Sequence, residues 1–173
     1  MLISKELNKA INEQIGHEFG ASLQYVAIAV HFDGEGLPSL ARHFYKQSNE
    51  EREHAMRFVK FLVDADGELE LPAVPAPRSR FKSAEEAVQL SLNWENEVTR
   101  QINGIMDLAI KQNNHIARNF LEWFMSEQLE EVSSMDTLLR MVRRAGEQGL
   151  LFVENYLQQG GNVSDGGGDG DDD

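Results

Sequence analysis

The stretch LARHFYKQSNEEREHAMRFVKF, residues 40–61, decides the predicted fold. Read in steps of three and four residues, it lines up one side of a helix, which is the side expected to face a hydrophobic core. That side consists of Leu40, Phe44, Gln47, Glu51, His54, Phe58 and Phe61. Its two ends are apolar and its middle is polar, so the helix is predicted to carry a carboxylate and an imidazole toward the core.

Three further segments show the same pattern, an apolar helical stripe with one glutamate near its middle. A helix from about Ser4 to His31 or Phe32 has the stripe Ile11, Ile15, Glu18, Ser22, Tyr25 and Ala29. A helix from about Ser83 to Gln112 has the stripe Val88, Ser91, Glu95, Val98, Ile102, Ile105 and Ala109. A helix that follows a break at residues 113–114 and ends near Ala145 has the stripe Ala117, Leu121, Phe124, Gln128, Glu131, Met135, Leu138 and Val142.

The connections between these helices predict their order in space. The first and last connections, residues 33–36 and 113–114, are short, so the helices that they join are antiparallel. The 17 residues from Asp66 to Lys82 hold three of the four prolines and are not continuous helix. Extended at about 3.3 Å per residue, this link spans about 56 Å, more than the about 42 Å of the first helix. The prediction is an all-α four-helix bundle with one long crossover between helices two and three.

The chain is predicted to hold one domain and a tail. Residues 1–158 form the domain, with the bundle ending at about residue 145 and a short apolar fifth helix at about 147–158. Residues 159–173, QGGNVSDGGGDGDDD, are of low complexity and are expected to be a disordered acidic tail. The tail resembles a calcium-binding glycine–aspartate repeat, but there is only one copy, so a solvated tail is the preferred interpretation.

Composition excludes several classes of function. The 173 residues include 16 basic and 29 acidic side chains and no cysteine, for a net charge of −13. This charge argues against nucleic acid and against an anionic membrane surface as partners. The lack of cysteine excludes disulfides, thiolate metal sites and thiol catalysis. The start of the chain has no apolar signal core and no apolar run is long enough to span a bilayer, so a cytoplasmic protein is expected.

The four stripe glutamates predict a metal site. A single glutamate on a helix ordinarily lies at the surface, but four at mid-length of four core stripes are a coincidence that needs a cause. Burying unpaired carboxylates costs several kcal/mol each, and the stripes hold no lysine or arginine to compensate. The carboxyls are therefore either protonated or bound to a multivalent cation. Oxygen ligands with one imidazole suit iron or manganese, and Glu51 is the natural bridge between two ions because His54 shares its face.

Other polar residues near the stripes have two interpretations each. Glu50, Glu127 and Glu130 adjoin the stripe positions and form either a solvated acidic face or further ligands. Tyr25 either packs in the core or hydrogen-bonds to a ligand carboxylate, whereas Gln128 is either a metal ligand or a spacer. The remaining histidines, which lie off the stripes, are expected to be surface or structural residues: His17, His31, His43 and His115.

At this point the chain resembles a bacterial non-haem ferritin over about residues 5–158. The resemblance is carried by HEFGASLQYVAIAVHFD (17–33), HFYKQSNEEREHAM (43–56), Glu95 and FLEWFMSEQLEEV (120–132). It implies a ferritin-like fold and a ferroxidase that oxidises Fe(II) with O2 or peroxide. It also implies storage of Fe(III) as a mineral inside a homo-oligomeric shell of 24 subunits, whose four-fold axis is lined by the fifth helix.

The resemblance also implies roles for particular residues. Glu18, Glu51 and His54 hold the first iron, whereas Glu51, Glu95 and Glu131 hold the second. Tyr25 and Gln128 flank this di-iron centre. A third iron site, present in many bacterial ferritins, corresponds to Glu50, Glu127, Glu130 and Glu131.

Two departures separate the chain from related families. Bacterioferritins have a second Glu-x-x-His and bind haem through a methionine just after the bridging glutamate. Here Glu131 is followed by Val-Ser-Ser and Glu51 by Arg52, so no haem is predicted. Animal ferritins line their three-fold channels with acids where this chain has Arg118 and Leu121, which leaves the route of iron into the shell open.

Two other functions remain to be weighed. One is a di-iron oxygenase or peroxidase, which requires a substrate pocket beside the metals. The other is an interaction bundle without metal, for which removal of the stripe glutamates would stabilise the fold and abolish nothing.

Overall fold

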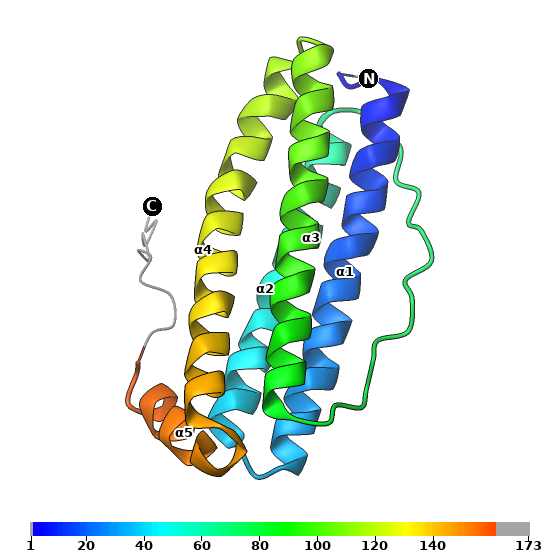
Figure 1. Cartoon of the computed structure of the whole chain (residues 1–173). Coiled ribbons are helices and arrows are strands. Elements are labelled where there is room, and N and C mark those ends of the chain that lie inside the picture. The colour runs from blue at the N-terminus through cyan, green and yellow to red at the C-terminus, as the bar shows by residue number, and fades with distance from the viewer. Residues whose placement is uncertain (1, 162–173) are drawn as a thin grey trace.

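Four long helices run side by side along one axis in the computed structural model, which describes residues 2–161 (Figure 1). The helices are α1 (Lys5–Gly34), α2 (Pro38–Asp64), α3 (Ala84–Lys111) and α4 (His115–Ala145). A turn of 3-10 helix, η1 (Glu147–Gly149), and the short helix α5 (Leu150–Gln158) follow at one end. The predicted all-α four-helix bundle with a short C-terminal helix is confirmed. Most of the predicted tail, residues 162–173, lies outside the described part of the chain.

Side chains that accept backbone N–H groups define where the helices begin. Ser4 accepts from the amide of Leu7 at 3.0 Å, and Ser83 accepts from the amide of Glu86 at 3.1 Å. Asn114 caps α4 in the same way. One predicted boundary was wrong, because α1 continues through Asp33 and Gly34. The first turn instead closes at Gly36, whose φ of +74° suits glycine. The predicted short fifth helix is present and consists of η1 followed by α5.

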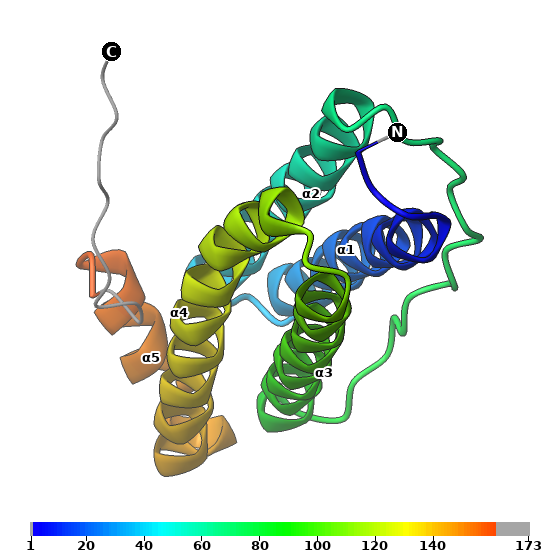
Figure 2. The same ribbon diagram turned by 90° about the horizontal axis from the view of Figure 1, so that it is seen from above.

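The long crossover between α2 and α3 runs the length of the bundle beside α1, as Figures 1 and 2 show. Amide side chains of α1 fix it in place: Asn12 Oδ1 accepts from the amide of Glu70 at 2.7 Å, and Gln24 Oε1 accepts from that of Arg78 at 2.9 Å. At Gly16 the link lies so close that a Cβ atom would be 2.3 Å from the Pro72 ring. The crossover returns the chain to the end of the bundle at which α2 begins, so α2 and α3 are parallel.

Two apolar clusters fill the bundle, one on each side of a polar middle layer. The cluster nearer α5 includes Phe32, Phe44 and Leu138, and the other includes Ile15, Phe58 and Phe124. Every residue of the predicted stripes on α2, α3 and α4 is buried. On α1 the exception is Ser22, which is half-buried and donates its hydroxyl to the carbonyl of Ser48 at 2.7 Å.

The helix α5 is attached to the bundle by a buried carboxylate. The N-terminus of α2 has no side-chain cap of its own, and Glu154 of α5 supplies one. Its two oxygens accept from the amides of Ser39 and Leu40 at 2.8 and 2.7 Å. A negative group at a helix N-terminus is favoured by the helix dipole, so this contact joins α5 to α2 by charge as well as by packing. Within residues 2–161 no helix combines the length and the apolar character needed to cross a membrane.

We predict that Glu154→Ala releases α5 from α2. Among residues 2–161 the substitution removes the only side-chain acceptor for two amides of the first turn, which costs about 1–2 kcal/mol of unfolding free energy. Hydrogen exchange at Ser39 and Leu40 is the direct measurement, and both amides should exchange faster. The control is Glu147→Ala. Within the described part of the chain Glu147 accepts only from the amide of Ala84, at 3.0 Å, at a helix start that Ser83 already caps. Unchanged exchange in Glu154→Ala would contradict the prediction.

Candidate metal centre

The middle layer of the bundle brings together one glutamate from each long helix and one histidine. These are Glu18 of α1, Glu51 and His54 of α2, Glu95 of α3 and Glu131 of α4. All five are buried, with exposed fractions between 1% for Glu18 and 8% for Glu131. Five residues that are separate in the sequence thus share one layer, because the four helices pack with their mid-points level.

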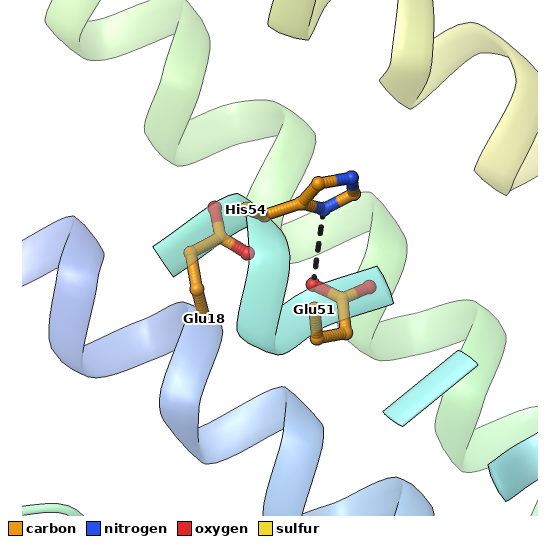
Figure 3. A group of neighbouring side chains, drawn as sticks. All are labelled: Glu18, Glu51 and His54. Carbon is orange, nitrogen blue, oxygen red and sulfur yellow. Dashed lines mark ion pairs between the residues drawn. The ribbon is translucent and has the colours of Figure 1, made fainter. Parts of the chain in front are cut away.

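Ligand atoms in this layer gather into two groups that share His54. Oxygen atoms of Glu18 and Glu51 and a ring nitrogen of His54 lie within 4.8 Å of one another (Figure 3). Ligand atoms of His54, Glu127 and Glu131 form a second group, and they also lie within 4.8 Å of one another. The imidazole stands between them, with Nδ1 3.4 Å from Glu51 Oε2 and Nε2 3.9 Å from Glu127 Oε2.

The electrostatics of the layer favour a bound cation. Burial raises the pKa of Glu18 from 4.5 to about 7, and burial together with the neighbouring glutamates raises the pKa of Glu51 and of Glu131. Burial lowers the pKa of His54 to about 4, with Arg57 adding to the shift, so the ring is neutral at pH 7 and keeps a lone pair for a metal. Among the described residues, the buried Glu18 Oε2 has no hydrogen-bond partner. A multivalent cation would supply that partner and lower the cost of ionising the carboxyls.

Neighbouring side chains orient the carboxylates. Tyr25 donates its hydroxyl to Glu95, and Gln128 Nε2 donates to Glu95 Oε2 at 3.2 Å. Tyr25 and Gln128 therefore both contact a candidate ligand, and burial raises the pKa of Tyr25 well above its usual value. Two further contacts were not predicted: Gln14 Nε2 donates to Glu18 Oε1 at 2.8 Å, and Thr99 Oγ1 accepts from Gln128 at 3.1 Å. Gln14 lies one turn before Glu18 on α1, a spacing that the sequence displays.

The adjoining acids lie along a groove beside this layer. The groove has a volume of about 440 Å³ and runs between α2 and α4. Its wall includes His54 and the four residues predicted as a third site, which are Glu50, Glu127, Glu130 and Glu131. Glu53, which was not singled out from the sequence, also lines it. The structure therefore places the inner and outer acids next to each other, with Glu131 and His54 common to both.

The other histidines lie away from the candidate ligands. His17 and His115 are exposed, and His31 packs its ring on Phe81 at a centroid distance of 5.3 Å. His43 is different because it lines the groove, and its buried Nε2 has no hydrogen-bond partner among the described residues. Periodicity did not single out His43, since it lies beside the stripe of α2 rather than on it.

Comparison with known proteins identifies relatives along most of the chain. The family described as "Ferritin-like domain" matches residues 8–145. Ferritin BfrB of Mycolicibacterium smegmatis is 42% identical over 155 residues, covering 90% of this chain and 85% of that protein. A bacterial non-heme ferritin of Staphylococcus aureus is 34% identical, with 90% and 95% covered. An open pore ferritin of Archaeoglobus fulgidus superposes with a TM-score of 0.87 at 31% identity, with 90% and 96% covered.

We predict that the metal-free protein loses stability as the pH rises and that Glu18 causes part of the loss. The pKa of Glu18 is about 7 when folded and near 4.5 when unfolded, so the folded state binds more protons between these values. The unfolding free energy therefore falls as the pH rises through this window. Glu18→Gln should remove this contribution. Between pH 5 and pH 7.5 the unfolding free energy of the variant should therefore fall by roughly 2 kcal/mol less than that of wild type.

Urea unfolding of metal-free protein at both pH values measures this effect. Glu122→Gln is the matched control, because Glu122 is exposed on α4 and away from the layer. If wild type and Glu18→Gln changed in parallel between the two pH values, Glu18 would not be a protonated buried carboxyl.

Proposed function

We propose that this chain, which belongs to the ferritin family of iron-storage proteins, is a ferroxidase that deposits ferric iron inside a shell of 24 copies. The observation that carries the proposal is the layer of four buried glutamates and one neutral histidine. Such a layer is unfavourable in an empty bundle and favourable around divalent cations. Because the residues are oxygen donors with a single imidazole, Fe(II) suits them as substrate better than a thiolate-seeking metal.

The proposed assignment uses Glu51 twice. Glu18, Glu51 and His54 bind the first Fe(II), while Glu51, Glu95 and Glu131 bind the second. The closeness of Glu18, Glu51 and His54 supports the first half of this assignment. For the second half, the charges of Glu95 and Glu131 both act on the pKa of Glu51, as expected of carboxyls that face the same space.

A pair of ferrous ions matches the electron demand of the oxidant. Each Fe(II) gives one electron, and O2 takes two electrons and two protons to become hydrogen peroxide. Hydrogen peroxide can oxidise another pair, taking two electrons and two protons to give two water molecules. Because both electrons leave together, no superoxide needs to be released. Tyr25 and Gln128 act as positioning residues, since both hold the Glu95 carboxylate by hydrogen bonds.

Oxidised iron leaves toward the outer acids in this proposal. Glu50, Glu127 and Glu130, with Glu131, form a third iron site along the groove. Carboxylate ligation is labile enough to let Fe(III) move on, and the groove supplies acidic side chains next to the centre. The ferric mineral then grows inside the shell, with α5 near the four-fold axis, in the cytoplasm. The proposal includes no haem, since Arg52 follows Glu51.

The groove also bears on the two alternatives. An oxygenase or peroxidase acting on an organic substrate would need a largely apolar pocket beside the metals. The groove next to His54 is instead lined mostly by charged and polar side chains. An interaction bundle without metal would leave the burial of four carboxyls unexplained. Iron oxidation and storage is therefore the function that the site supports best.

We predict a fast phase of Fe(II) oxidation that consumes about two irons per chain, or three if the outer site fills. The measurement is the Fe(III) absorbance after stepwise addition of Fe(II) in air. Glu51→Gln and Glu95→Gln should lower the initial rate by at least about tenfold, because each loses a ligand of the pair. Glu122→Gln, with the same chemical change on the exposed face of α4, should oxidise iron as wild type does. Wild-type rates in Glu51→Gln would contradict the proposed centre.

Storage is tested separately from oxidation. We predict that the protein sediments as a 24-subunit particle and keeps far more iron in solution than its fast phase consumes. Sedimentation velocity before and after iron loading measures both properties, because a mineral-filled particle sediments faster at the same diameter. Precipitation of all iron beyond the fast phase, or a particle of a few subunits, would favour a di-iron enzyme instead.

A further inference from the structure

The groove between α2 and α4 differs in charge along its length. Its middle is acidic, with Glu50, Glu127, Glu130 and Glu131 in its wall. Toward α5 its wall consists of Ser39, Arg42, His43, Lys46, Ser134, Leu157, Gly160 and Gly161. Within residues 2–161, this end has no acidic side chain in its wall. The carboxylate of Glu154, on the neighbouring helix, is already bound to the amides of Ser39 and Leu40.

Two groups at this end lack partners. Arg42 makes no ion pair and no hydrogen bond with any residue in the described part of the chain. The Nε2 atom of His43, on the next residue of α2, is buried and has no hydrogen-bond partner either. Leaving a buried polar nitrogen without a partner is unfavourable, so a ligand or solvent molecule that reaches it is favoured. The Arg42 guanidinium and this nitrogen both line the α5 end of the groove, and together they are donors of the kind that bind an oxyanion.

The charges around His43 favour an anion over a cation. Burial lowers the pKa of His43 to about 4, with the charge of Lys46 adding to the shift, so the ring is neutral at pH 7 and can offer an N–H. Lys46 itself pairs with Glu50 at 3.2 Å. A second metal ion here would be repelled by Arg42, whereas an oxyanion would be attracted by it; the charge of Lys46 is offset by its partner Glu50.

We propose that the α5 end of the groove binds inorganic phosphate, held by the guanidinium of Arg42 and by Nε2–H of His43. The groove of which this end is a part has a volume of about 440 Å³. Along α2, Arg42 and Glu50 are eight residues apart, which is about 12 Å of helix. Phosphate at this place would lie about two helical turns from the proposed outer iron site. If the proposed function holds, ferric iron that leaves the centre would meet phosphate on its way.

Binding is tested on the iron-free full-length protein, so that it does not depend on iron oxidation. Inorganic phosphate is titrated into the protein and followed by isothermal calorimetry and by the ring signals of His43 in NMR spectra. Wild type should bind one phosphate per chain with saturation, and the His43 signals should shift. Arg42→Gln should weaken binding by about tenfold or more, because it removes a charge-assisted donor.

Three further variants separate a binding role from a structural one. Arg42→Lys keeps the charge and should restore part of the affinity. His43→Phe keeps an aromatic side chain but removes the ring N–H, so it should weaken phosphate binding. Arg144→Gln is the matched control, since Arg144 is exposed in the last turn of α4, outside the groove, and its loss changes the net charge equally. Absence of saturable binding, or equal affinities for Arg42→Gln and Arg144→Gln, would overturn the proposal, whatever the outcome for iron oxidation.

Discussion

Burial of four carboxyl groups inside a helical bundle is the constraint on which the rest of this structure depends. In water these groups would each carry a charge, but between two apolar clusters their ionised forms are unfavourable and repel one another. Tyr25, Gln14 and Gln128 reduce the cost by donating hydrogen bonds, yet one oxygen of Glu18 remains without a partner. A metal ion between the carboxylates would resolve the conflict, so the feature that destabilises the empty bundle is also the one on which the proposed iron site rests.

The architecture serves to bring these groups to one level. Four helices of similar length place their mid-points together only if their starts and ends are fixed, which the caps at Ser4, Ser83 and Asn114 achieve. The crossover makes α2 and α3 parallel and is fixed to α1 by amide side chains. The attachment of α5 through Glu154 holds this helix at the end of the bundle where Leu157 lines the groove beside the centre. The fold thus determines that the four glutamates lie at one level of the bundle.

Much of this could be predicted from the sequence, for reasons that are physical. Helical periodicity fixes which side of each helix is buried, so the burial of Glu51, Glu95 and Glu131 follows from the sequence. Prolines and length were enough to predict the crossover. Periodicity says nothing about which residue of one helix meets which residue of another, so the contact between Gln128 and Thr99 could not be predicted. The same limit applies to His43, whose surroundings depend on how α2, α4 and α5 are rotated against each other.

The most direct test of the account is an anomalous difference map at the iron edge, from crystals exposed to Fe(II) without oxygen. The account predicts two iron peaks in the middle layer, one beside Glu18 and His54 and the other beside Glu95 and Glu131. Glu51 should contact both peaks. A map without iron in this layer, with the four glutamates as closely packed as in the metal-free bundle, would contradict the claim that their burial exists to bind metal.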